Sequence, residues 1–201
     1  MTSRLSRLLF SALIFLPFIT HAEGTIETYT LDPGHSYVSW QISHFGFSNP
    51  SGKWLANGTL SVDETKPQNS KVNVVIKVAD IVTGIPKLDD HLRNADFFDT
   101  DKYPNATYVS DKIVMTGKDT AKLYGTLTLH GISKPITLNV KLNKLDVSPI
   151  TQKKTAGFTA TADLKRSDFG ITKYLPGLGD KVKLNIEVEA AKENTNSTTS
   201  S

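Results

Sequence analysis

The chain has 201 residues, of which 38% are hydrophobic and 21% charged, a composition typical of one soluble globular domain. It contains no cysteine, which excludes a disulfide scaffold, a cysteine-ligated metal site and a cysteine nucleophile. The formal charge of +3, from 23 basic and 20 acidic residues, is too even and too dispersed for a nucleic-acid binder, so we expect no DNA or RNA partner.

Residues 1–22 have the features of a secretory signal peptide. Arg4 and Arg7 form a basic start, residues 8–19 are almost wholly apolar, and Ala22 offers a small residue for cleavage. The apolar run is shorter than the ~20 residues that span a bilayer. We therefore expect cleavage near Ala22 and a periplasmic or secreted mature protein, with a membrane anchor or a buried first helix as the alternative.

Most of the chain after residue 26 alternates apolar and polar residues with a period of two, which is typical of strands with one buried face. Clusters of Gly, Pro and Asn separate many of these segments, as expected for tight turns. In residues 106–116 the alternation is irregular, because Tyr108 and Val114 share one face while Ile113 and Met115 share the other. The expected strands, in chain order, are residues 27–31, 36–44, 54–62, 72–78, 106–116, 123–129, 136–142, 158–164 and 182–188.

Sequential hairpins of such strands favour an all-β fold, a closed antiparallel barrel of about eight strands, because closure removes the unpaired edges of an open sheet. A two-sheet sandwich is the alternative. One segment, residues 87–99, breaks the pattern and predicts a short inserted helix with Leu88, Leu92, Ala95 and Phe98 on its buried face. This helix is expected to close one end of the sheet or to gate a cavity.

The end of the chain, residues 193–201, is polar and lacks apolar periodicity, so we expect a disordered tail. A single folded domain is therefore expected over residues 23–192.

Five motifs, in order and with suitable spacing, resemble those of the YceI-like family of periplasmic proteins. The match extends over residues 29–189, and the motifs are DPGHS at 32–36, HFGF at 44–47, HLRNADFFD at 91–99, LTLHGISKP at 127–135, and GF at 157–158 followed by KRSDFG at 165–170. The resemblance implies a lipocalin-like barrel with a long apolar pocket for an isoprenoid chain, a cofactor-free carrier, and a link to isoprenoid quinones or to stress.

Inward parity, combined with this resemblance, predicts which residues bind such a ligand. Apolar side chains should surround the chain, and polar ones should meet its head group at the opening of the pocket. The expected lining is Val38, Trp40, Ile42, Trp54, Leu60, Ile76, Val78, Phe97, Phe98, Leu127, Leu129 and Phe158, with His44, His91 and Arg93 facing the head group.

The sequence evidence for catalytic or metal-binding residues is weaker than the evidence for a ligand-binding cavity. Asp32, His35 and Ser36 have the residue types of a hydrolase triad, but adjacent strand residues point to opposite faces, and no Gly-x-Ser-x-Gly motif occurs. The histidines lack the short spacing of a metal site. We expect no catalytic residue, no metal and no cofactor.

The sequence thus predicts a non-catalytic protein that binds, sequesters or transports a long-chain amphiphile such as an isoprenoid or isoprenoid quinone. Transient membrane contact and a homodimer are compatible with this role. The alternatives are a periplasmic hydrolase or isomerase acting on a lipid, and a structural or interaction barrel with a solid core.

Overall fold

The structure is a computed structural model that describes residues 25–193. The expected signal peptide and the expected tail beyond Glu193 lie outside the described residues.

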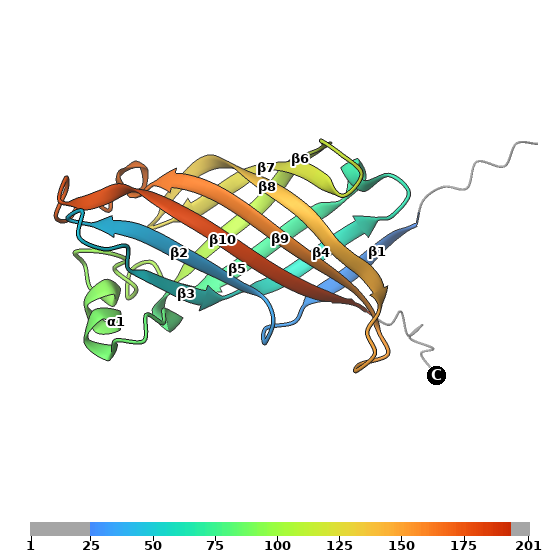
Figure 1. Ribbon diagram of the computed structural model, residues 1–201, viewed down its shortest axis with the longest axis horizontal. Helices are drawn as coiled ribbons and strands as arrows, with labels where there is room; N and C mark the ends of the chain where they lie inside the picture. The colour runs from blue at the N-terminus through green and yellow to red at the C-terminus, as the bar shows by residue number, and fades with distance from the viewer. Residues whose placement is uncertain (1–24, 194–201) are drawn as a thin grey trace, which may run out of the picture.

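Strands make up most of the described chain (Figure 1). In chain order the elements are β1 (Ile26–Leu31), β2 (Tyr37–His44), β3 (Ser51–Leu55), β4 (Asn57–Asp63), η1 (Pro67–Asn69), β5 (Lys71–Lys77), η2 (Val78–Asp80), α1 (Pro86–Arg93), β6 (Asn105–Met115), β7 (Thr120–Leu129), β8 (Ile132–Val147), β9 (Lys154–Lys165), η3 (Arg166–Phe169) and β10 (Leu178–Lys192).

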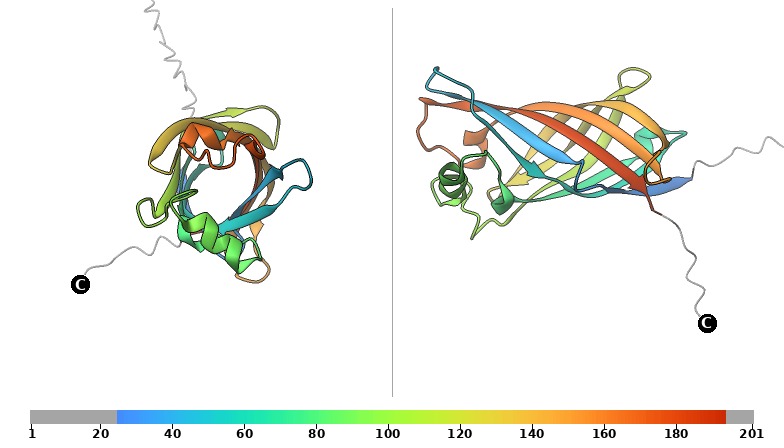
Figure 2. Two further views of the ribbon diagram at one scale, coloured as in Figure 1. Left: turned by 90° about the vertical axis from the view of Figure 1, so that its left-hand side faces the viewer. Right: turned by 60° about the horizontal axis from the view of Figure 1, so that its bottom comes forward.

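All ten strands belong to one antiparallel sheet that closes on itself, as the end-on view in Figure 2 shows. The order is β1-β4-β5-β6-β7-β8-β9-β10-β2-β3, and β1 pairs with β10 to close the ring. Because β10 pairs with both β1 and β2, these two short strands occupy one position in the barrel, and β3 and β4 occupy the next. The expected closed barrel of eight positions is confirmed, and the sandwich is excluded.

The expected strand 54–62 is divided because the chain leaves the β2 pairing after Leu55 and joins β1 from Asn57. Ala56 lies between the two strands, where its amide donates to the Ser36 carbonyl at 2.9 Å.

A β-bulge explains the irregular alternation in residues 106–116. Ser110 pairs with Gly125 and Lys112 pairs with Tyr124, so Asp111 is an extra residue in β6. Tyr108 faces inward before the bulge and Ile113 faces inward after it, since one inserted residue inverts the parity. A second bulge at Asn143 does the same to β8.

A packed group of side chains (the plug) closes the end of the barrel at which Figure 2 shows α1. Its members come from β3, η2, α1, β6 and the connections after η2, α1 and η3: Trp54, Val78, Ile81, Leu92, Phe97, Ala106 and Ile171. The indole N–H of Trp54 donates to the Val78 carbonyl at 2.9 Å, which satisfies its polar atom inside the plug.

The inserted helix is shorter than the sequence predicts. It ends at Arg93 because Asn94 adopts an extended conformation, and the Asn94 side-chain oxygen accepts a hydrogen bond from the Asp96 amide. The irregular turn that follows buries Phe97 and leaves Ala95 exposed, the reverse of the helical expectation for Ala95. No helix in the described range is long and apolar enough to cross a membrane.

Two polar side chains fasten the helix to the preceding segment. Arg93 Nε donates to the Ala79 carbonyl at 2.7 Å. Asp89 Oδ1 accepts from the Thr83 amide at 2.8 Å and from the Thr83 hydroxyl at 2.6 Å. These bonds hold α1 at the end of the barrel.

Gly58 allows a close approach between β4 and β5. Its φ is +154°, and a Cβ built there would lie 2.1 Å from the Asn73 carbonyl oxygen. The backbones of β4 and β5 cannot move apart at this point without breaking the pairing of Gly58 with Val74.

We predict that Gly58→Ala lowers the free energy of unfolding by about 3 kcal/mol, because the methyl group meets backbone rather than a movable side chain. Urea denaturation followed by circular dichroism measures this. Gly157→Ala is the matched control, since its Cβ would meet only ordinary contacts at 3.9 Å. Equal stabilities of the two variants would contradict the prediction.

Candidate functional site

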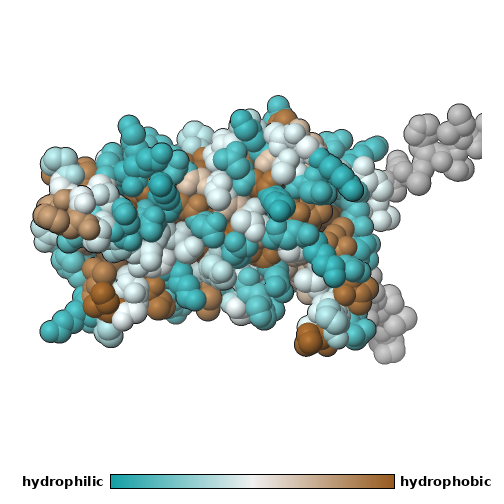
Figure 3. Space-filling model, viewed as in Figure 1, coloured by the Kyte–Doolittle hydropathy of each residue, from teal (hydrophilic) through white to brown (hydrophobic). Residues whose placement is uncertain are grey.

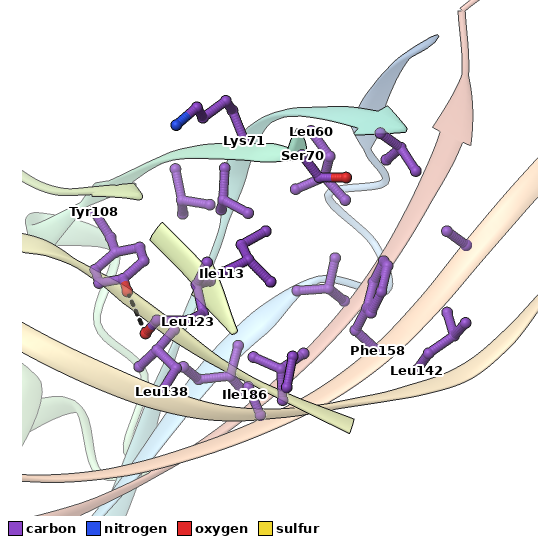
Figure 4. A pocket seen from close by; sticks show the side chains of 18 of the residues that line it. Leu60, Ser70, Lys71, Tyr108, Ile113, Leu123, Leu138, Leu142, Phe158 and Ile186 are labelled. Carbon is purple, nitrogen blue, oxygen red and sulfur yellow. Dashed lines mark hydrogen bonds between the residues drawn. The ribbon is translucent and has the colours of Figure 1, made fainter. Parts of the chain in front are cut away.

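The interior of the barrel contains a cavity of about 290 Å³ (Figure 4). Every one of the eight positions contributes an apolar side chain to its wall. One representative from each is Val38 of β2, Leu60 of β4, Val74 of β5, Ile113 of β6, Leu123 of β7, Leu138 of β8, Ala160 of β9 and Ile186 of β10.

Small inward residues leave this space open. An eight-stranded barrel is just wide enough for its side chains to fill it, or for one ligand to occupy it. Here Ala56, Ala156 and Ala160 face the cavity with only a methyl group each. Val72 and Val140 also line the cavity and are only half-buried.

The main polar side chain in the wall is already satisfied by the protein. Tyr108 lies against Gly125, where a Cβ would be 2.6 Å from its ring. Its hydroxyl donates to the Leu123 carbonyl at 3.1 Å, drawn in Figure 4, and lies 3.3 Å from the Ile136 carbonyl. Burial raises the pKa of this phenol above its ordinary value. The wall therefore offers apolar contact rather than a free proton donor.

The cavity reaches the surface at the end opposite α1, between the β4–β5 connection and the β6–β7 turn (the mouth). Its exposed lining residues there are Glu64, Pro67, Lys71, Lys118, Asp119 and Thr120, with Asp63 and Ser70 behind them. The site thus combines an apolar interior with a charged opening, the division expected for an amphiphile.

Asp63 holds the β4–β5 connection in place at the mouth. Its carboxylate accepts hydrogen bonds from the Thr65 hydroxyl at 2.8 Å, the Lys66 amide at 2.8 Å, the Thr65 amide at 3.0 Å and the Asn69 side chain at 3.1 Å. These bonds, that of the Thr65 hydroxyl foremost, hold the pKa of Asp63 below its ordinary value.

Glu64 joins the mouth to the neighbouring wall. Lys154 Nζ of β9 donates to its carboxylate, and the Tyr29 hydroxyl donates to the same oxygen at 3.1 Å. The bond from Lys154 is the main reason that the pKa of Glu64 is lowered. The Tyr29 phenol has a raised pKa, first because it is buried.

Five of the expected ligand-binding residues line the cavity. They are Val38, Leu60, Ile76, Leu127 and Phe158. Their parity in the sequence correctly gives the direction of their side chains.

The other ten lie outside the wall of this cavity, and their role in ligand binding stays a prediction. Trp54, Val78 and Phe97 form part of the plug, and Trp40, Phe98 and Leu129 pack against it. Ile42 is buried farther along β2, and its amide donates to Pro50. Parity gives the direction of a side chain but not its height along the barrel, and at this height the plug fills the interior.

The expected head-group residues also lie at the plugged end. His44 is exposed and packs edge-on against Phe45. His91 packs against Phe97, and the Asn94 side chain lies 3.1 Å from its Nδ1. Arg93 binds backbone carbonyls and Asp90. None of these three residues reaches the mouth, and a role for them in ligand binding stays a prediction.

Sequence reasoning overlooked much of the wall and all of the mouth. Val74, Leu138 and Ile186 line the cavity and lie on the apolar faces of strands with the same alternation as the expected lining residues. The alternation could therefore have predicted them as well. The mouth residues carried no comparable signal, because turns have no period that reveals which face they cover.

The residues considered for catalysis lie in the connection between β1 and β2. His35 Nδ1 is 2.8 Å from Asp32 Oδ2, which raises the pKa of His35 and lowers that of Asp32. Ser36 is buried, and its hydroxyl donates to the Glu189 carbonyl at 3.0 Å. The three side chains therefore form no proton relay to Ser36. The carboxylate of Glu189 lies near Asp32 and His35, and this trio is partly or fully exposed to solvent.

A family model described as the YceI-like domain matches residues 29–190. The chain is 38% identical over 160 residues to Protein YceI of Escherichia coli O17:K52:H18, covering 79% of this chain and 83% of that protein.

Solved structures share the fold. The YCEI protein of Campylobacter jejuni superposes with a TM-score of 0.67 at 32% identity, over 76% of this chain and 91% of that one. A structure described as a polyisoprenoid binding domain from Saccharophagus degradans superposes with a TM-score of 0.62 at 16% identity, over 82% of this chain and 98% of that one.

We predict that acidification removes the contribution of Asp63 to stability. Its folded-state pKa lies below the unfolded value of about 3.9, so the contribution is complete above that value and is lost as the pH falls through the folded pKa. At pH 7 Asp63→Asn should have a lower urea midpoint than the wild type, and the difference should shrink towards pH 2.

The control for this measurement is Asp111→Asn, which removes an exposed carboxylate with no hydrogen bond in the described range. Its midpoint should follow that of the wild type at both pH values. If the urea midpoint of Asp63→Asn is as far below that of the wild type at pH 2 as at pH 7, the carboxylate charge does not contribute to stability.

Proposed function

Since the chain belongs to the YceI-like domain family, we propose that its barrel binds, sequesters or transports a long-chain amphiphile, namely an isoprenoid or an isoprenoid quinone. The proposal includes a periplasmic or secreted location, supported by the basic and apolar character of residues 1–22.

The observation that carries this proposal is the apolar cavity inside a closed wall. Its volume of about 290 Å³ is about twice that of the ~150 Å³ apolar cavity known to hold one benzene molecule. The space therefore corresponds to about a dozen carbon atoms, or two to three isoprene units. The description of the Saccharophagus degradans barrel as polyisoprenoid-binding supports the same class of ligand.

Hydrophobic burial supplies the affinity. At ~0.8 kcal/mol per methylene, about ten buried methylene equivalents contribute ~8 kcal/mol, a micromolar affinity before ordering costs. Aliphatic walls contact any hydrocarbon chain almost equally well. Discrimination between ligands must then come from the head group at the mouth, where Lys71, Lys118 and Asp119 lie.

Binding rather than catalysis fits the polar groups of the wall. The two buried residues of the lining that carry polar side chains already have partners within the protein: Tyr108 donates to backbone carbonyls, and Asp63 accepts hydrogen bonds from its own connection. A lipid inside the cavity would meet groups that already have partners.

We predict that Ala160→Trp abolishes ligand uptake while preserving the fold, because the indole would fill the middle of the cavity. Protein purified from cells should release a hydrophobic molecule on solvent extraction and show its mass in native mass spectrometry, whereas the variant should show neither. The matched control is Thr161→Trp, one residue along β9 and exposed on the outer face. Wild-type protein that never carries a hydrophobic molecule would refute the proposed function.

A second prediction concerns chain length. In displacement of a fluorescent hydrophobe by 1-alkanols, affinity should rise about fourfold per methylene up to about twelve carbons and then level off, because further carbons remain outside the cavity. In a Leu60→Phe variant, whose larger side chain narrows the cavity, the affinity should level off at a shorter alkanol. Affinity that keeps rising through twenty carbons, or that ignores length, would contradict this volume limit.

A further inference from the structure

The mouth is surrounded by lysines that have no acidic partner. They lie on the β4–β5, β6–β7 and β8–β9 connections and on the adjoining strand ends. Seven exposed lysines there form no ion pair within the described range: Lys66, Lys71, Lys112, Lys118, Lys122, Lys141 and Lys153.

Acidic residues around the mouth are fewer, and most of them already form ion pairs or hydrogen bonds within the protein. Glu64 pairs with Lys154 and Asp146 pairs with Lys144. Asp63 is buried and accepts hydrogen bonds from its own connection. Only Asp111 and Asp119 remain as exposed, unpaired acids on these three connections and adjoining strand ends. The field at the mouth is therefore positive, although the chain as a whole is nearly neutral.

An apolar tip projects beside these lysines. The β8–β9 connection carries Ile150, which is 86% exposed, and Val147, the last residue of β8, is 52% exposed. In Figure 3 the hydrophobic atoms at the lower right lie where Figure 1 shows this hairpin, with hydrophilic residues around them. The hairpin belongs to the same end as the mouth, since the Leu142 amide donates to the Asp119 carbonyl at 2.8 Å and Lys154 pairs with Glu64.

The opposite end has exposed apolar residues too, notably Phe47 at 91% exposure. Its charges, however, are nearly balanced when paired groups are counted as well, and the plug separates it from the cavity. The basic residues on its connections and adjoining strand ends are the ten residues Lys53, Lys77, Lys87, Arg93, Lys102, Lys134, Lys165, Arg166, Lys173 and Lys181, and the acidic ones are the nine residues Asp80, Asp89, Asp90, Asp96, Asp99, Asp101, Asp163, Asp168 and Asp180. Counted in the same way, the mouth has the seven lysines above with Lys144 and Lys154, against only five acids: Asp63, Glu64, Asp111, Asp119 and Asp146.

We propose that the mouth end docks on the surface of an anionic lipid bilayer, with the lysines facing the head groups and Ile150 inserted between them, so that the ligand passes between the membrane and the cavity. This inference rests on the proposed function for its purpose, but the docking itself is measured without a ligand. Lysines near an anionic bilayer are each attracted by the surface potential, and an adjacent apolar side chain adds burial at the interface.

The test is sedimentation of the purified protein with vesicles of phosphatidylglycerol and phosphatidylcholine, compared with pure phosphatidylcholine. Wild-type protein should bind the anionic vesicles at low salt and be released at 1 M salt, where the Debye length is about 3 Å. Neutralising Lys66, Lys112 and Lys153 together to Gln should weaken partitioning on the order of 100-fold, about fivefold for each lysine. Ile150→Asp should weaken it as well.

Matched controls carry the same changes at the plugged end. A triple variant with Lys87, Lys134 and Lys165 changed to Gln, and Phe47→Asp, should sediment like the wild type. Absence of binding to anionic vesicles, equal binding to phosphatidylcholine, or greater loss in these controls would overturn the proposal. Circular dichroism confirms that each variant is folded.

Ligand loading separates this proposal from the proposed function. Uptake of a soluble fluorescent hydrophobe without vesicles should be the same in the wild type and in all these variants, since none of the changed residues lines the cavity. Normal loading without vesicle binding would refute docking alone. Vesicle binding without any loading would refute the carrier function and leave the docking surface in place.

Discussion

Closure of the sheet by the β1–β10 pairing is the constraint on which the structure depends. Every strand except β3 pairs with a strand on each side, and Lys53 of β3 exchanges backbone hydrogen bonds with Val82 instead, so backbone hydrogen bonds hold the wall together without a completely filled core. The interior can then remain partly empty. Ala56, Ala156 and Ala160 face that interior and keep it so. In an open sheet or a sandwich, the same small residues would have been packed against an opposing layer.

The two ends of the barrel differ in structure, because one is filled by side chains and the other is open. At the α1 end, aromatic and aliphatic side chains from several connections form the plug, and Arg93 and Asp89 fasten the helix over it. At the other end, Asp63 and Glu64 stabilise the connections around an opening instead of filling it. A cavity closed at one end and open at the other admits a ligand chain in one orientation, with its apolar part inside.

This asymmetry gives the charge distribution a functional meaning. The unpaired lysines surround the open end, together with the exposed Ile150, whereas the plugged end has charges of both signs. An anionic membrane would therefore attract the end through which a lipid can pass. The apolar wall and the basic mouth are separate features, which is why the experiments above can test them separately.

Residue patterns predict the direction of side chains well and their height along the barrel poorly. Val38 and Trp40 share a strand face, and both point inward. Val38 lines the cavity, but Trp40 packs against the plug. The choice between these outcomes depends on where the α1 segment folds over the barrel, and this contact joins residues far apart in the chain. For the same reason, no local pattern reveals that Arg93 donates to the Ala79 carbonyl.

The sequence by itself determined the class of the fold, the strands and the inward faces, because alternation with a period of two is a local property of each strand. It also contained the motifs by which the family could be identified. Tertiary structure alone decided which strands share a position, where bulges at Asp111 and Asn143 invert the parity, which end is plugged and where the mouth lies. These features depend on register and on contacts between distant segments, and no local pattern encodes them.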